Sequence, residues 1–275
     1  MWYSRLVFIR ANPNQGNYPK YRYLIFTPLS WMMKGIIDFL LSDSSEAKLL
    51  RENIVFKIVP MLNMDGVIEG NHRCSLASVD LNRQWLYPSP TEHPTIYSTK
   101  KLILHIQQTN EILMFVDLHG HFRKKNIFMY GCNNDQDSSL RHRECIVPYL
   151  LSQLDPNFSY EDSSYKITQA KRSCGRVVVG KDLKVLRSYT MEASFSGMSS
   201  GPNKDFHLNI GMLEDVGKHL CQVLTFFVDP SSQQKVEETY QLLISMKELT
   251  NNPSESEDTK GAKKKPRKKI IKKKN

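Results

Sequence analysis

The most constraining feature of this sequence is the apolar stretch 112–118, which ends in Asp117-Leu118-His119-Gly120-His121. A short apolar run of this kind is typical of a strand that is buried on both faces. Open α/β sheets bind their ligands at the ends of such strands. The stretch therefore predicts a buried strand with His119 just past its end, where a neutral imidazole can bind a metal or make hydrogen bonds.

Strand and helix patterns alternate along the chain, which predicts an α/β fold with a mixed, mostly parallel sheet flanked by helices. The apolar run 54–61 predicts another strand buried on both faces, whereas 63–94 predicts a long irregular segment of the kind that carries function. Further strands are predicted at 5–9, 21–26, 126–130, 176–179 and 189–195, a loop at 12–17, and helices from a Ser30 cap onward and at 44–50, 95–109, 138–154, 208–228 and 236–248.

The formal charge of +10 comes from one end of the chain. Residues 260–275 hold ten Lys or Arg and no acid, which leaves 28 basic and 28 acidic residues elsewhere. We therefore expect a folded domain at 1–248 and a disordered Lys-rich tail at 249–275. The folded part is not basic, so nucleic acid is not its expected partner; the tail allows nuclear import as an alternative.

Cysteine use and hydropathy indicate a cytoplasmic protein. The five cysteines are scattered without CxxC spacing, which suits free thiols in a reducing compartment. No stretch has the length and apolarity of a membrane span, and the first residues do not resemble a signal peptide.

Three polar residues of the irregular segment, Arg73, Asn82 and Arg83, have the chemistry to hold a carboxylate. A guanidinium binds a carboxylate through two parallel hydrogen bonds, and an amide adds orientation. The alternative is three solvated loop residues.

Glu192 and Arg176 are candidates from the second half of the chain. The apolar setting of Glu192 predicts a raised pKa, as a general base needs, or else a buried ion pair with an arginine such as Arg187. Arg176 is either a cation in a specificity pocket or an exposed strand arginine.

Taken together, these segments resemble the cytosolic carboxypeptidase family of zinc metallopeptidases. The resemblance implies that His119 is a zinc ligand and that Glu192 activates water. It assigns Asn82 and Arg83 to the terminal carboxylate, Arg73 to the scissile carbonyl and Arg176 to the side-chain pocket. The motifs that carry it are Pro60-Met61-Leu62-Asn63-Met64-Asp65-Gly66, Asp80-Leu81-Asn82-Arg83-Gln84-Trp85, Asp117-Leu118-His119-Gly120-His121 and Thr190-Met191-Glu192-Ala193-Ser194-Phe195.

The implied activity is zinc-dependent hydrolysis of C-terminal residues, with glutamate on acidic or polyglutamylated protein tails, such as those of tubulin, as the expected substrate. Two alternatives are a zinc-free module that binds acidic C-termini and a fragment without function.

One motif of the resembled family is missing. None of the eight histidines is followed by an acid three positions later, so the family's His-Pro-Gly-Glu turn is not found. Thr27 is followed directly by Pro28, and about ten residues of the family pattern are absent at this junction. The match to the family resumes at Trp31. We therefore expect a partial catalytic domain, truncated on its N-terminal side, that binds zinc poorly.

Overall fold

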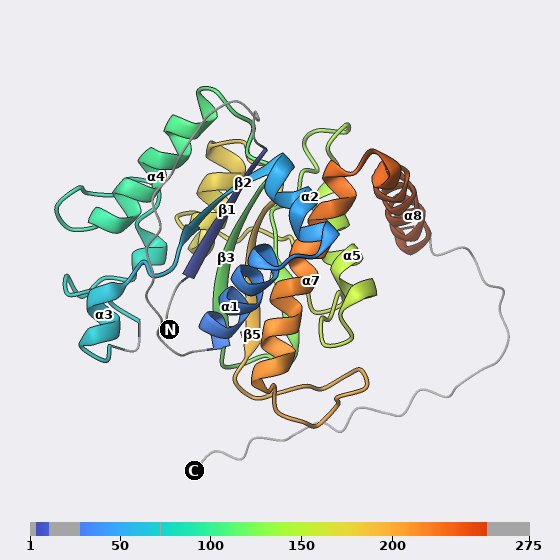
Figure 1. Ribbon diagram of the computed structural model, residues 1–275. Coiled ribbons are helices and arrows are strands. Elements are labelled where there is room, and N and C mark those ends of the chain that lie inside the picture. The colour runs from blue at the N-terminus through green and yellow to red at the C-terminus, as the bar shows by residue number, and fades with distance from the viewer. Residues whose placement is uncertain (1–3, 11–27, 72, 252–275) are drawn as a thin grey trace, which may run out of the picture.

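The computed structural model describes residues 4–10, 28–71 and 73–251 (Figure 1). The predicted loop 12–17, the predicted strand 21–26 and almost all of the Lys-rich tail lie outside the described residues.

A five-stranded sheet in the order β2-β1-β3-β5-β4 forms the centre of the fold. Its strands are β1 (Ser4–Arg10), β2 (Ile54–Val59), β3 (Met114–His121), β4 (Ile127–Tyr130) and β5 (Ser188–Ser194). The β3–β5 pair is parallel, and the pairs β1–β2, β1–β3 and β4–β5 are antiparallel. The predicted α/β class with a mixed, helix-flanked sheet is confirmed, but antiparallel pairs outnumber parallel ones among the described strands.

Helices cover both faces of this sheet (Figure 1). One layer contains α1 (Pro28–Leu41), α2 (Ser45–Asn53), α5 (Ile146–Leu154), α7 (Ile210–Val228) and α8 (Gln233–Asn251). The other contains α4 (Pro94–Gln107), α6 (Gly175–Val177) and the π-helix η4 (Val178–Asp182). None of the described helices is long and apolar enough to cross a membrane.

Side chains of the central strands alternate between these two layers. Met114, Val116 and Leu118 of β3 pack in the core formed with α1 and α7. Phe115 packs in the opposite core, formed with α4 and η4. Since successive strand residues point to opposite faces, Asp117 and His119 lie on the same face as Phe115, away from α1 and α7.

Four sequence-based assignments are corrected. The strand β2 lies at the sheet edge with only Ile54 buried, so it is not buried on both faces. The run 176–179 is helical, because a short apolar run fits a buried helix as well as a strand. The helix α1 begins at Pro28 and contains Ser30 instead of being capped by it.

The fourth correction concerns 138–154, where the helix α5 begins only at Ile146, after the short 3₁₀ turn η2 (Arg143–Cys145). The irregular segment 63–94 is confirmed in outline. It contains the short helix α3 (Met64–Ile68), capped by Asn63, and the 3₁₀ turn η1 (Leu81–Arg83).

The helices α1 and α7 approach closely because each presents a glycine to the other. A Cβ atom at Gly217 of α7 would lie 2.1 Å from the carbonyl oxygen of Met32, and one at Gly35 of α1 would lie 1.9 Å from that of Glu214. Neither position has room for a larger residue. An ion pair from Lys34 to Glu214, 2.9 Å long, joins the same two helices at the surface.

We predict that Gly217→Ala destabilises the protein by about 1–3 kcal/mol, because the added methyl group must separate two packed backbones. Gly211→Ala in the same helix is the control, since its Cβ would lie 3.4 Å from the Asn209 side chain, an ordinary contact. We expect that variant to be neutral or slightly stabilising. Urea denaturation measures both, and an equal effect of the two substitutions would contradict the close-packing argument.

Candidate active site

His119 and Glu192 lie side by side because the parallel strands β3 and β5 pair in a register that sets one opposite the other. His119 Nδ1 is 3.9 Å from Glu192 Oε1. His119 Nε2, on the other side of the ring, is 2.9 Å from Asp117 Oδ2. Asp117 is thus the carboxylate beside Nε2, and Nδ1 is the nitrogen that faces Glu192. His119 lies within β3, not past its end as predicted.

Glu192 is buried, with 7% of the residue exposed. Its Oε2 atom is inaccessible to water and has no hydrogen-bond partner among the described residues. Burial raises the pKa of Glu192 to about 7, although the charge of His119 acts in the opposite direction. A carboxylate with a pKa near the working pH is suited to take up a proton and return it. The predicted raised pKa is therefore confirmed.

The two arginines of the irregular segment share one carboxylate. Arg73 Nε donates to Asp80 Oδ2 at 2.7 Å, and Arg83 Nη1 lies 3.8 Å from the same oxygen. The other oxygen of Asp80 accepts from the backbone N–H of Asn82 at 3.0 Å and so caps the turn η1. Asp80 thus holds Arg73, Asn82 and Arg83 in one cluster, and all three are at least partly buried.

Arg176 joins this cluster through its neighbour in the chain. The backbone N–H of Gly175 donates to Asn82 Oδ1 at 2.8 Å. Arg176 Nε donates to the carbonyl oxygen of Gly131 at 3.0 Å, and its guanidinium lies 5.5 Å from the centre of the Tyr130 ring. Arg176 is 4% exposed, so the alternative of an exposed strand arginine is wrong.

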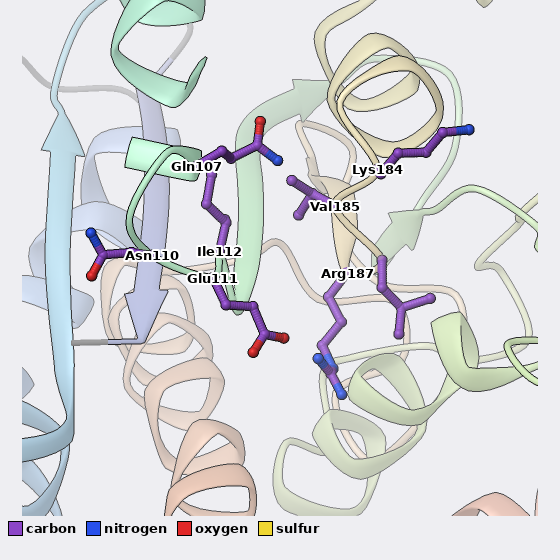
Figure 2. A pocket seen from close by; sticks show the side chains of 8 residues that line it. Gln107, Asn110, Glu111, Ile112, Lys184, Val185 and Arg187 are labelled. Atoms are coloured by element: carbon purple, nitrogen blue, oxygen red, sulfur yellow. The ribbon is translucent and has the colours of Figure 1, made fainter. Parts of the chain in front are cut away.

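The alternative partner of Glu192, Arg187, lies elsewhere. Arg187 directly precedes β5 and lies five positions before Glu192, which separates their backbones by roughly 16 Å in an extended chain. Arg187 packs over the Phe227 ring at 4.5 Å. It lines a different pocket, near Glu111 and Lys184 at the other end of β5 (Figure 2). A structural ion pair with Arg187 therefore does not explain the burial of Glu192.

His121 and the basic run after it form one side of the site. His121 Nδ1 accepts the backbone N–H groups of Arg123 and Lys124, at 3.2 and 2.9 Å. Lys124 pairs with Asp162, whereas Arg123 and Lys125 are exposed. Desolvation, and then the charge of Lys124, lower the pKa of His121. The turn therefore fixes the orientation of the His121 ring.

Two residues that matter here were missed by the sequence reasoning. Asp80 was not singled out, although an Asp two positions before an Asn that needs an N–H partner is the usual pattern of a capped turn. Lys171 was also missed, because nothing in its local sequence distinguishes it from a solvated lysine.

A catalytic zinc needs three protein ligands. In the described part of the chain, no three His, Cys, Asp or Glu side chains are grouped so that they could hold a metal ion. His119 Nδ1 is suitably placed as one ligand. The sequence before α1, residues 1–27, contains no His, Cys, Asp or Glu to supply the others. The donors that the structure describes therefore do not fit a catalytic zinc site, and no step of the chemistry is derived through the metal.

Comparison with known proteins defines the family. A family profile described as "Zinc carboxypeptidase" matches residues 30–198. The human protein "Cytosolic carboxypeptidase 2" is 42% identical over 221 residues, 80% of this chain and 24% of that protein. "Cytosolic carboxypeptidase 1" of Danio rerio is 44% identical over 232 residues, 80% of this chain and 19% of that protein.

This chain belongs to the zinc carboxypeptidase family, as the resemblance of its motifs implied. It spans about a quarter of the length of the cytosolic carboxypeptidases that it matches. The family match begins at residue 30, directly after the junction where the first zinc motif is missing.

Solved structures agree on the fold. The metallo-carboxypeptidase from Burkholderia cenocepacia superposes with a TM-score of 0.63 at 20% identity, over 73% of this chain and 53% of that one. A metallo-carboxypeptidase from Pseudomonas aeruginosa gives a TM-score of 0.62 at 24% identity, over 72% and 53%.

The raised pKa of Glu192 predicts that stability depends on pH. The ordinary value is 4.5 and the folded value about 7, so the folded state binds the proton more tightly than the unfolded state. The stability that the protonated Glu192 contributes is complete below pH 4.5. It is lost as the pH rises through 7, which lowers the free energy of unfolding by roughly 3 kcal/mol. We expect Glu192→Gln to remove this loss and to be the more stable protein at pH 8.

Denaturant unfolding between pH 5 and pH 8 measures the effect. The exposed residue Glu161 provides the control, and Glu161→Gln should keep the wild-type pH dependence. If Glu192→Gln and the wild type have parallel pH profiles, Glu192 does not titrate near neutrality.

We also predict that the purified chain retains well below one zinc ion after dialysis against a mild chelator. One imidazole out of three ligands leaves little affinity. Metal analysis of the wild type, of His119→Ala and of the exposed control His207→Ala tests this. Stoichiometric zinc that survives dialysis would show that other residues complete the site.

Proposed function

We propose that this domain acts on acidic C-terminal tails and that its reaction is the hydrolytic removal of a C-terminal glutamate. Tails of tubulin and other polyglutamylated proteins are the proposed substrates, and the cytoplasm is the proposed location. One observation carries the proposal: Arg176, which the Gly175–Asn82 bond joins to the cluster of Arg73 and Arg83, lies within electrostatic reach of a buried carboxyl, Glu192, whose pKa is raised to about 7. The covered share of the relatives is about a quarter, so the substrate is argued from this cluster alone.

The residues divide the recognition among them. Asn82 and Arg83 bind the terminal carboxylate, because an amide and a guanidinium together fix both of its oxygens. Arg73 stabilises the charge that develops on the oxygen of the scissile carbonyl. Glu192 takes a proton from the attacking water and delivers it to the leaving amine. Asp80 keeps both arginines in place during these steps.

An acidic side chain is favoured by the charge balance of the site. Asp80 is shared by two arginines, and Arg176 is buried with backbone and sulfur acceptors instead of a carboxylate. Positive charge is therefore in excess, and a ligand with two carboxylates neutralises it best.

A second candidate is a zinc-free module that binds acidic C-termini without cleaving them. The observation that favours it is that, among the described residues, no three His, Cys, Asp or Glu side chains are grouped so that they could hold a metal ion. The carboxylate-binding residues do not need the metal for their charge or their hydrogen bonds.

We predict that the chain binds a Glu-terminated peptide with a free carboxylate more tightly than the same peptide with a C-terminal amide. One bidentate arginine–carboxylate pair contributes on the order of 1.5–3 kcal/mol. Calorimetry should show that Arg83→Ala erases the difference, while Arg172→Ala, at an exposed arginine paired with Asp182, retains it. The Lys-rich tail attracts the free acid more than the amide, but it does so equally in every variant, so the comparison is made between variants. Equal affinity for acid and amide would exclude both candidate functions.

The two candidates are separated by restoring the missing turn. Insertion of a His-Pro-Gly-Glu turn between Thr27 and Trp31 is expected to give zinc binding and release of glutamate from peptides, as detected by mass spectrometry. Glu192→Gln in that background should abolish cleavage, because an amide cannot act as a base. Cleavage by the unmodified chain would mean that the turn is dispensable, and a restored protein that binds zinc but cleaves nothing would favour the binding module.

A further inference from the structure

Two loops that are distant in the sequence are joined by backbone hydrogen bonds beside the candidate site. The N–H of Trp85 donates to the carbonyl oxygen of Ser173 at 3.2 Å, and the N–H of Gly175 donates to Asn82 Oδ1 at 2.8 Å. The N–H of Cys174 in turn donates to the carbonyl oxygen of Lys171 at 3.1 Å. Lys171, the last residue of the 3₁₀ turn η3 (Gln169–Lys171), is therefore held next to the loop that carries Arg83.

Lys171 differs from the other cations of the cluster in its bonding. Arg73 and Arg83 contact Asp80, and Arg176 is bonded to Gly131 and to the sulfur of Cys174. Lys171 is exposed, and within the described ranges its ammonium group makes no hydrogen bond or ion pair. All three of its N–H donors are consequently available to a ligand.

Electrostatic effects agree with this position. Partial desolvation, followed by the charges of Arg83, Arg73 and Arg176, lowers the pKa of Lys171. Burial has the largest effect on the pKa of Glu192, followed by the charges of His119 and Asp117. The charge of Lys171 comes next, and it lowers that pKa more than the charge of Arg176 does. Lys171 thus lies within electrostatic reach of the carboxylate anchors, the proposed specificity pocket and the proposed base.

We propose that Lys171 is a specificity-determining residue that binds the side-chain carboxylate of an acidic C-terminal residue, alongside Arg176. This inference rests on the proposed function and assigns its selectivity. Arg176 alone offers little, because it is 4% exposed and two of its nitrogens are already bonded. Asn82 and Arg83 hold the terminal carboxylate, which leaves Lys171 as the mobile cation for the second negative charge.

The test measures the affinity of the full chain for three peptides that differ only at the C-terminus: a free-acid glutamate, a free-acid glutamine and a glutamate amide. The wild type is expected to favour glutamate over glutamine. Lys171→Met should lower the ratio of the affinities for glutamate and glutamine roughly fivefold, which is the effect of losing one partly exposed charge pair. Lys171→Arg should keep most of it. Lys166→Met, at an exposed lysine five residues earlier, is the matched control and should change nothing.

The outcomes separate the inference from the function on which it depends. If acid and amide bind equally to the wild type, the proposed function fails and the inference falls with it. If the acid is favoured but Lys171→Met leaves the glutamate-to-glutamine ratio unchanged, Lys171 is a solvated lysine and only the inference is overturned. Support requires that Lys171→Met lower the ratio while the acid-to-amide difference and the midpoint of thermal unfolding stay at their wild-type values.

Discussion

The register between β3 and β5 is the constraint on which the site depends. Parallel pairing sets Asp117 opposite Thr190 and His119 opposite Glu192. A slip of one residue would turn Glu192 into the apolar layer beneath α7 and bring Met191 to the site face, because side chains alternate with a period of two. That exchange would remove Met191 from its core and bury a carboxylate there without a partner. The packing of α1 and α7 thus fixes the position of the base from the opposite side of the sheet.

A second constraint is the fixation of the cationic loops. Loops are mobile by default, since few contacts hold them. Here the buried Asn82 accepts a hydrogen bond from Gly175, and Asp80 binds both arginines while it caps the turn η1. Leu81 and Trp85, which are 4% and 0% exposed, fix the same loop to the core beside α4. The carboxylate-binding residues are therefore set in place before a ligand arrives, which reduces the entropy lost on binding.

Much of the fold followed from local patterns. The apolar runs of β3 and β5 and the helical spacing of α4 and α7 are strong signals, and they were confirmed with small errors at the ends. The edge position of β2 was not predictable, because apolar content alone does not say which strands lie on either side. The helical state of Val177, Val178 and Val179 is set by tertiary packing, which overrode their preference for strands.

The candidate site was predicted in part, and the division has a physical cause. Arg73, Asn82, Arg83, His119, Arg176 and Glu192 were identified because their motifs carry chemistry at fixed spacing. Asp80 contacts residues within seven positions of itself, so its capping pattern was a local signal that went unused. Lys171 reaches the cluster through contacts between segments about 90 residues apart, as the bond from Gly175 to Asn82 shows, and no local pattern encodes such contacts. The burial of Arg176 likewise depends on Gly131 and Tyr130, which belong to another part of the chain.

The electrostatics of the site are unfavourable in two ways, and a bound ligand would compensate for both. Among the described residues, the buried Glu192 has no hydrogen-bond partner at Oε2, and four cations lie near one another with Asp80 as the carboxylate that neutralises two of them. Such arrangements reduce stability and are tolerated where a ligand compensates for them. A dianionic C-terminus would neutralise the excess positive charge at the arginines and Lys171. A ligand that binds only the folded state stabilises that state by mass action. The unfavourable electrostatic free energy that the ligand relieves therefore adds to the free energy of binding. The same surplus of charge that weakens the domain would thus supply the selectivity that we propose for acidic tails.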